Sequence, residues 1–157
     1  MSSSTTRRFR PLALLAAPLA AMALVGITAT SASAAGSASV SPSTGLSTDD
    51  TVAVTATGLD ASTSYYVFNC DLDEFADGTV LCDWDAGYYT TATSDSSGDL
   101  TASIPVAQEF DGRHYPGASA TSITCLGDTG SQCGIVVYPV THSGSSVNYA
   151  SASITFD

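Results

Sequence analysis

Apolar residues recur at every second position along this chain. In residues 51–57 (TVAVTAT), valine and alanine alternate with threonine, and Gly58 ends the run. A period of two puts one set of side chains on a buried face and the other set in solvent, as in a half-buried β-strand. No run after residue 35 has the period of an amphipathic helix. The sequence therefore predicts an all-β protein.

Similar runs predict about eight short strands separated by turns rich in serine, glycine and aspartate. The expected strands are 51–57, 64–70, 79–82, 88–93, 100–106, 122–125, 134–140 and 147–156. Asp77-Gly78 is a hairpin turn signal, whereas residues 107–120 lack any period and are expected to form a long loop. In about 120 residues, such strands bury their apolar faces best in a two-layer Greek-key sandwich of immunoglobulin-like plan.

The N-terminal residues 1–34 are typical of a secretory signal peptide. Three arginines precede an apolar run over 11–27, and small residues end in Ala-Ser-Ala at 32–34. A membrane anchor is the alternative, but the run is short for a span, two prolines interrupt it and no basic flank follows. We expect cleavage after Ala34, which leaves one secreted, extracellular domain over 35–157.

All four cysteines lie in the expected domain, at positions 70, 82, 125 and 133. An even number in a small exported chain predicts disulfides. Three pairings are possible, and the local one is favoured because each bond would close a short loop within an expected hairpin. A zinc site is the alternative, but no C-x-x-C pair is present, and His114 and His142 are isolated.

The expected domain is strongly acidic. From residue 35 onward it has one basic residue, Arg113, against 15 acidic residues, a formal charge of −14. Phosphate binding needs clustered lysine or arginine, so direct binding of nucleic acid by the protein is excluded. Adsorption to an anionic membrane is excluded for the same reason. We expect a monomer whose partner is a small molecule.

No motif in the sequence points to catalysis or to a metal. A G-x-S-x-G nucleophile elbow is absent, and serine and aspartate are so abundant that a Ser–His–Asp combination carries no weight. The acidic run 71–74 fails the EF-hand spacing, since Phe75 occupies a ligand position. Glu109 and Asp111 more simply form an ion pair with Arg113. We expect no enzyme activity, no cofactor and no metal; a secreted hydrolase is the least favoured alternative.

Large aromatic residues gather around the first cysteine pair and in the long loop. Phe68 and Phe156 are explained by core packing alone. Phe110 and Tyr115 are different, because they lie in a loop rich in glycine and proline, where a structural role needs less aromatic surface. Together these regions predict a cleft lined by rings and disulfide edges, which suits a flat aromatic ligand.

The chain resembles the neocarzinostatin family over essentially all of the expected domain. The matching pieces are ASVSPSTGLS at 38–47, the strand at 51–59, both cysteine spacings, Val106 with Phe110-Asp111-Gly112, and the ending Ile154-Thr155-Phe156. The resemblance implies a Greek-key sandwich of about seven strands with two disulfide-closed ribbons, Cys70–Cys82 and Cys125–Cys133. It also implies a secreted apoprotein that binds an enediyne antibiotic chromophore non-covalently, protects it and delivers it. The chromophore, and not the protein, damages DNA.

Carried over by position, the resemblance implies a ligand cleft. Its residues are Cys70, Leu72, Leu81, Cys82, Tyr88, Phe110, Tyr115 and Tyr138. Two of the departures from the family pattern alter the cleft wall: Leu72 replaces a tryptophan, and Gly134 replaces a glutamine. Two others would fill the cleft if they pointed into it: Tyr138 replaces a small hydroxyl residue, and Arg113 replaces a phenylalanine.

The alternative function is a secreted immunoglobulin-like protein-interaction module with no enediyne ligand. The two functions require different surfaces. A carrier needs a concave, ring-lined hollow, whereas a module that binds another protein needs a flat exposed patch. The shape of the surface near the first cysteine pair therefore distinguishes them.

Overall fold

The computed structural model describes residues 36–73, 80–125, 131–141 and 149–157. All of them belong to the second of two compact units of the chain, residues 32–157. The described strands are β1 (Ser37–Ser41), β2 (Thr51–Thr57), β3 (Ser64–Asp71), β4 (Leu81–Asp83), β5 (Tyr89–Thr93), β6 (Leu100–Pro105), β7 (Glu109–Arg113), β8 (Thr121–Thr124), β9 (Cys133–Pro139) and β10 (Ala150–Ser153). No helix in this part of the chain could cross a membrane. The expected signal peptide lies outside the described residues.

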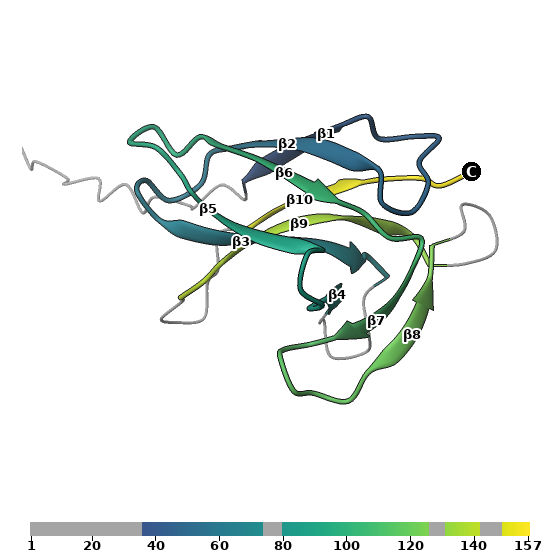
Figure 1. The fold of residues 1–157 in the computed structure, drawn as a ribbon. Helices are drawn as coiled ribbons and strands as arrows, with labels where there is room; N and C mark the ends of the chain where they lie inside the picture. The colour runs from purple at the N-terminus through teal and green to yellow at the C-terminus, as the bar shows by residue number, and fades with distance from the viewer. Residues whose placement is uncertain (1–35, 74–79, 126–130, 142–148) are drawn as a thin grey trace, which may run out of the picture. The chain divides into compact units, whose positions relative to one another are not determined.

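The smaller sheet has three antiparallel strands in the order β1-β2-β6 (Figure 1). Its central strand, β2, is the alternating valine–threonine run: Val52, Val54 and Ala56 are buried, and the threonines are exposed. Val54 pairs with Val40 of β1 and with Ala102 of β6. The period of two in the sequence is therefore the alternation between the inner and outer faces of this sheet.

The larger sheet has seven strands, in the order β10-β9-β3-β4-β7-β8, with β5 also paired to β3. β9 lies along one side of β3. Along the other side, β5 pairs with residues 64–68 and β4 with residues 70–71. β4 and β5 are thus two pieces of one neighbouring strand, interrupted by residues 84–88. Beyond β4, the strands β7 and β8 continue the sheet (Figure 1).

The hydrophobic core lies between the two sheets. Val52 and Ile104 reach it from the smaller sheet, and Val67, Ile135 and Val137 reach it from the larger one; all are at most 1% exposed. Burial of a valine or isoleucine side chain contributes about 1.5–3 kcal/mol to folding. This core leaves the other face of the larger sheet free to carry a site.

Tyr65 anchors the beginning of β3. Its ring is fully buried in the core, and its hydroxyl oxygen accepts a hydrogen bond from the Asp60 N–H at 2.9 Å. A tyrosine hydroxyl bonded to the backbone a few residues upstream is the tyrosine corner of immunoglobulin-like sandwiches. The turn before β3 is therefore held by a side chain from the core.

The predicted fold class is confirmed. Two antiparallel sheets face each other, and both disulfides are local, Cys70–Cys82 and Cys125–Cys133. The structure describes ten strands where the sequence predicts about eight, because β1 and β7 have no counterpart among the expected ones. The expected strands 79–82 and 88–93 correspond to β4 and β5. The serine-rich β1 has too weak an apolar alternation to be recognised. The hairpin turn expected at 77–78 lies outside the described residues.

The expectation of a loop over 107–120 is wrong in its first half. There β7 pairs with both β4 and β8. Gly112 was interpreted as a loop residue, but a Cβ at this position would lie 2.8 Å from the Cβ of Leu81 and 2.9 Å from Ile123 Cγ1. Glycine within a strand often marks a place where a neighbour approaches closely. Gly112 is such a strand glycine, because only a residue without a Cβ fits beside Leu81 and Ile123.

Candidate ligand-binding site

The outer face of the larger sheet carries a second apolar cluster. Because neighbouring residues of a strand point to opposite faces, Tyr65 and Val67 of β3 face the core, whereas Tyr66, Phe68 and Cys70 face outward. The buried members of the outer cluster are Phe68, Cys70, Cys82 and Val136. The period of two that builds the core therefore also builds this second surface.

Aromatic rings of the outer cluster support one another. The ring centroids of Phe68 and Trp84 are 4.5 Å apart, and Tyr66 lies 5.1 Å from Phe68 and 5.4 Å from Trp84. The rings are tilted or edge-to-face, the geometries that aromatic quadrupoles favour, at about 0.5–1.5 kcal/mol per pair. Trp84 is held further by its Nε1–H, which donates to the backbone oxygen of Arg113 at 3.1 Å. We call this arrangement the Trp84 wall.

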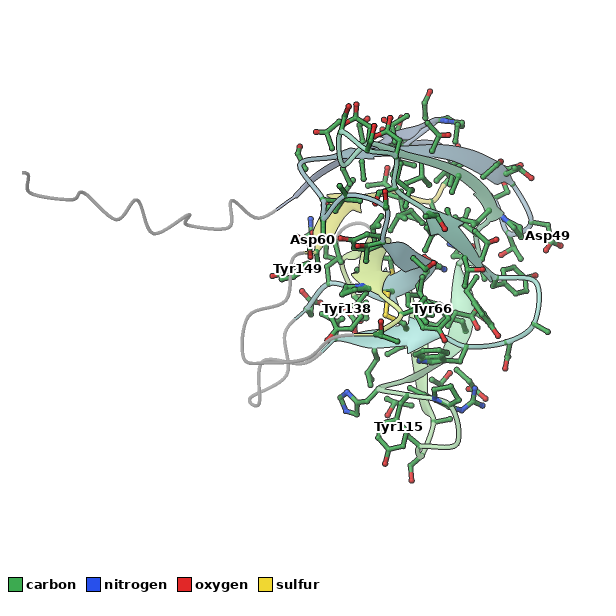
Figure 2. All side chains as sticks on the ribbon, turned by 90° about the vertical axis from the view of Figure 1, so that its left-hand side faces the viewer. Asp49, Asp60, Tyr66, Tyr115, Tyr138 and Tyr149 are labelled. Carbon is green, nitrogen blue, oxygen red and sulfur yellow. A yellow bond between two sulfur atoms is a disulfide. The ribbon has the colours of Figure 1, made fainter. Side chains whose placement is uncertain are left out.

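A cavity of about 510 Å³ opens over these rings. Its aromatic lining residues are Tyr66, Phe68, Trp84, Tyr115, Tyr138 and Tyr149; Figure 2 labels the tyrosines among them. Among the residues that the structure describes, no lining residue is acidic, and His114 and Ser151 add polar groups. The volume lies within the range of about 300–1,000 Å³ that is typical of small-molecule sites.

The first disulfide and Leu72 complete the cavity. Cys82 lines it, and its bonded partner Cys70 lies fully buried behind. Leu72 lies against Gly134 of β9: a Cβ on Gly134 would be 2.4 Å from Leu72 Cδ1. Glycine at position 134 therefore leaves the space into which the leucine side chain fits.

Arg113 is engaged outside the cavity. Its Nη1 lies 3.3 Å from Asp85 Oδ1, and its Nη2 lies 3.9 Å from Asp111 Oδ2. Nearby, the buried Asp83 accepts a hydrogen bond from the Asp85 N–H at 2.9 Å, and burial raises the pKa of its carboxyl group. Arg113 is not among the residues that line the cavity, so it does not fill the hollow.

A comparison with known protein families identifies the family to which the chain belongs. A sequence profile described as the Neocarzinostatin family matches residues 38–156, nearly all of the described unit. The chain belongs to the neocarzinostatin family. The assignment agrees with the resemblance found in the opening stretch, in both cysteine spacings and at the C-terminal end.

Two relatives of the neocarzinostatin family extend this result. Macromomycin from Streptomyces macromomyceticus is 35% identical over 101 residues, which are 60% of this chain and 67% of the relative. Apokedarcidin from an actinomycete (strain L585-6) is 34% identical over 124 residues, 78% of this chain and 99% of the relative.

Solved structures of the same two proteins match the fold. The macromomycin structure is 31% identical, covers 78% of this chain and all of its own, and gives a TM-score of 0.62. The solution structure of apokedarcidin is 32% identical, covers 79% of this chain and all of its own, and gives a TM-score of 0.51. This chain is therefore similar to both relatives in sequence and in backbone fold.

Four of the residues expected in the neocarzinostatin-type cleft line the cavity. They are Leu72, Cys82, Tyr115 and Tyr138. Cys70 belongs to the outer cluster but lies behind its disulfide partner. Tyr138 lines the cavity without closing it, since the volume remains about 510 Å³ with the ring in place.

The structure places the other three expected cleft residues elsewhere. Leu81 and Phe110 are buried in the core between the sheets. Leu81 precedes Cys82 in β4, so strand alternation turns it to the opposite face. Tyr88 lies against the same core and donates its hydroxyl proton to Asp49 Oδ1 at 2.5 Å, which raises the pKa of Tyr88. None of the three lines the cavity: Leu81 and Phe110 lie in the core, and Tyr88 is partly buried against it.

Sequence reasoning left most of the rings that line the cavity unassigned. Phe68 was interpreted as core, yet it faces the cavity. Counting in steps of two from Cys70 along its strand reaches Phe68 and Tyr66, and the same count from Cys82 reaches Trp84. This signal was available in the sequence. No such count finds Tyr149, because it lies outside the strands that carry the cysteines.

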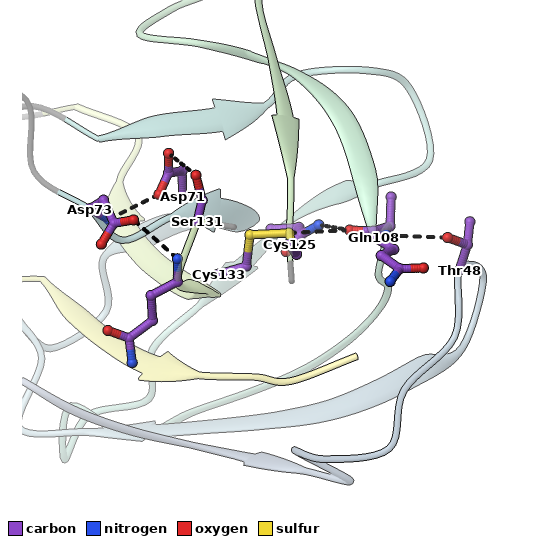
Figure 3. The surroundings of a disulfide bond; sticks show 10 residues. Thr48, Asp71, Asp73, Gln108, Cys125, Ser131 and Cys133 are labelled. Atoms are coloured by element: carbon purple, nitrogen blue, oxygen red, sulfur yellow. Dashed lines mark hydrogen bonds between the residues drawn. A yellow bond between two sulfur atoms is a disulfide. The ribbon is translucent and has the colours of Figure 1, made fainter. Parts of the chain in front are cut away.

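The acidic residues after β3 have structural partners. Asp71 accepts hydrogen bonds from Ser131 Oγ at 3.0 Å and from the Asp73 N–H at 3.0 Å, while Asp73 accepts one from the Gln132 N–H at 3.1 Å (Figure 3). They join the end of β3 to the segment before β9. In the described part of the chain, no group of three or more His, Cys, Asp or Glu side chains is placed to hold a metal ion.

The second disulfide lies near this junction. Cys133 begins β9, and the Cys125 N–H donates to the Gln108 oxygen at 2.8 Å (Figure 3). Gln108 in turn donates its N–H to Thr48 Oγ1 at 3.2 Å. A smaller cavity of about 290 Å³ borders both cysteines. The Cys125–Cys133 bond thus ties the β8 end to β9, away from the ring-lined cavity.

Proposed function

We propose that this chain is a secreted apoprotein that binds a small aromatic or enediyne-type antibiotic chromophore without a covalent bond, protects it and delivers it. The observation that carries the proposal is the ring-lined cavity on the outer face of the larger sheet of a neocarzinostatin-family protein. In this proposal the protein is not an enzyme, and damage to DNA comes from the released chromophore.

The chemistry of the cavity supports a flat, apolar guest. Phe68, Leu72 and Val136 offer only apolar contacts, while the tyrosine hydroxyls and His114 offer polar ones. Burial of roughly 300 Å² of apolar ligand surface at about 25 cal/mol per Å² gives about 7 kcal/mol before the costs of association. A guest held there is shielded from water and thiols on its buried side. This shielding is how the protein would protect the chromophore.

The exposed apolar surface also favours a carrier over a protein-interaction module. Among the described residues, the exposed large apolar side chains are Tyr115 at 63% and Tyr149 at 46%. Both line the cavity. The exposed aromatic surface is thus concentrated around a hollow, where it can contact a small guest. A protein-binding module would instead expose such surface on a flat patch.

Native mass spectrometry of the protein recovered from its own culture medium tests this proposal directly. We expect a second species that is heavier by the mass of one small organic molecule and that disappears after extraction with organic solvent. Protein that carries no such molecule, and that fails to bind flat aromatic probes when they are added, would contradict the carrier function.

Replacement of Tyr138 by serine tests the position of the site. Because Tyr138 lines the cavity, the substitution Tyr138→Ser should enlarge it, and the affinity for a bulky aromatic probe should rise by about threefold to tenfold. Tyr88→Ser is the matched control, since Tyr88 lies against the core and not in the cavity. Equal probe affinity in the wild type and in both variants would place the binding site elsewhere.

A further inference from the structure

We infer that Arg113 is a positioning residue that holds the Trp84 wall of the cavity in place. The inference rests on the proposed function, because it concerns how the cavity keeps its shape around a guest. Arg113 does not touch the cavity itself. Its action is indirect, through the residues that follow β4.

Arg113 contacts this segment at two successive residues. Its backbone oxygen accepts the Nε1–H of Trp84 at 3.1 Å, and its guanidinium group lies 3.3 Å from the carboxylate of Asp85. Arg113 is also paired with Cys82 in the ladder between β4 and β7. One residue thus holds the end of β4, the indole ring and the next carboxylate in a single geometry.

Arg113 is the only lysine or arginine after residue 35 that can neutralise the carboxylates around it. Asp83, Asp85 and Asp111 surround it, and no other lysine or arginine occurs after residue 35. The Arg113 side chain is 23% exposed, whereas its partners Asp85 and Asp111 are 62% and 57% exposed. Without the guanidinium group, three carboxylates would repel one another where β4 pairs with β7.

A change at Arg113 should reach the ligand through Trp84. The indole is packed against Phe68 at 4.5 Å and Tyr66 at 5.4 Å, and all three line the cavity. These rings belong to the outer cluster and not to the core between the sheets. Exposed ion pairs contribute little to global stability, so loss of Arg113 should lower ligand affinity more than it lowers the stability of the fold.

The test uses Trp84 as a reporter, because it is the only tryptophan in the chain. Arg113→Met removes the charge and keeps the length of the side chain, and Arg113→Lys is the conservative control. For Arg113→Met we expect Trp84 emission to shift to the red and its quenching by acrylamide to increase. The dissociation constant of the neutral probe N-phenyl-1-naphthylamine should rise by about threefold to fivefold, and Arg113→Lys should recover most of both effects.

A salt titration separates positioning from other effects. In the wild type, high sodium chloride should weaken probe binding and increase Trp84 quenching, because it screens the ion pairs of Arg113. Arg113→Met should lack this salt dependence. Asp85→Asn should resemble Arg113→Met, because it removes the shorter of the two ion pairs, whereas Asp111→Asn should have a smaller effect.

Several results would overturn the inference. Unchanged Trp84 emission, quenching and probe affinity in Arg113→Met would show that the side chain does not hold the wall. A loss of affinity that only follows a fall in unfolding free energy, with no recovery in Arg113→Lys, would reduce Arg113 to a general stabilising residue. If the wild type neither carries a small molecule from its culture medium nor binds the probe, the proposed function fails, and Trp84 emission and quenching alone then decide the role of Arg113.

Discussion

In this small sandwich, single buried polar side chains make hydrogen bonds that hold the backbone near the strand ends. The hydroxyl of Tyr65 is one example, since it satisfies the Asp60 N–H at the start of β3. Asp83 is another: its carboxylate is 2% exposed and is stabilised locally by the Asp85 N–H. Asn69 is a third, fully buried with its Nδ2 donating to the Ala107 oxygen at 2.8 Å. The Tyr65 and Asn69 bonds link β3 to other segments, and the Asp83 bond holds the turn directly after β4.

Substitution of Tyr65 by phenylalanine tests the tyrosine corner. Tyr65→Phe keeps the ring but leaves the Asp60 N–H without this acceptor, so the free energy of unfolding should fall by about 1–2 kcal/mol. Urea unfolding measures the change. Tyr115→Phe is the control, since Tyr115 is 63% exposed, and its effect should stay within about 0.5 kcal/mol. Equal stabilities of the two variants would refute a structural role for the corner.

Because of Asp83, the free energy of unfolding should depend on pH. Burial raises the pKa of Asp83 above its ordinary value of 3.8, so the fold favours the protonated carboxyl. Its contribution to stability is therefore most favourable below pH 3.8 and declines as the pH rises through the folded-state pKa. Asp83→Asn, which keeps an acceptor for the Asp85 N–H, should raise the free energy of unfolding at pH 7 by up to about 1 kcal/mol. The gain should vanish near pH 3.

Asp95 provides a control of opposite sign. Its carboxylate accepts the N–H groups of Asp99 and Ser97, which lower its pKa. A lowered pKa gives stability that is present above the unfolded value and is lost as the pH falls through the folded value. Asp95→Asn should therefore destabilise the protein at pH 7 and have little effect at pH 3. Equal pH profiles for the Asp83 and Asp95 variants would contradict both assignments.

At the scale of elements, the two disulfides have different tasks. Cys70–Cys82 joins β3 to β4 and forms part of the cavity wall, whereas Cys125–Cys133 ties the β8 end to β9. Their sequence separations are 12 and 8, so the two closed loops are of similar size. Loop entropy thus gives them similar stabilising effects, while their positions give them different relations to the ligand.

Removal of each disulfide should separate stability from binding. The double variants Cys70→Ala/Cys82→Ala and Cys125→Ala/Cys133→Ala should each lose roughly 3 kcal/mol of unfolding free energy in the chain-entropy model. Only the first should also weaken binding of an aromatic probe, because Cys82 lines the cavity. Thermal unfolding and probe titration measure the two effects. Equal losses of affinity would argue against a cavity wall at Cys82.

At the scale of the whole molecule, the strongly acidic surface should repel DNA, the target of the proposed chromophore. The chain from residue 35 onward has one arginine against 15 acidic residues, and that arginine is engaged with Asp85 and Asp111. Repulsion between this acidic surface and DNA phosphates should keep the protein away from the duplex. In the proposed function, we therefore expect the guest to leave the cavity before it reaches DNA.

Ligand-free protein should show no detectable affinity for duplex DNA at moderate salt. The physical reason is that residues 35–157 contain no basic cluster that could release counterions from the duplex. Fluorescence anisotropy of a labelled duplex measures this, with a basic DNA-binding domain as the positive control. Tight, salt-sensitive binding by the ligand-free protein would overturn the charge argument and, with it, the proposed division of labour between protein and chromophore.

The sequence by itself determined the all-β class and pointed to the family, and the cysteine spacing favoured local disulfides, because alternation and spacing are local properties of the chain. It also contained the outward-facing series Tyr66, Phe68 and Cys70, which alternate with the core residues of the same strand. Tertiary structure alone decided that β7 is a strand and that Phe110 lies in the core. It also decided that Arg113 pairs with Asp85 rather than entering the cavity. These outcomes depend on which strands become neighbours, and pairing between distant segments is not encoded in any short stretch of residues.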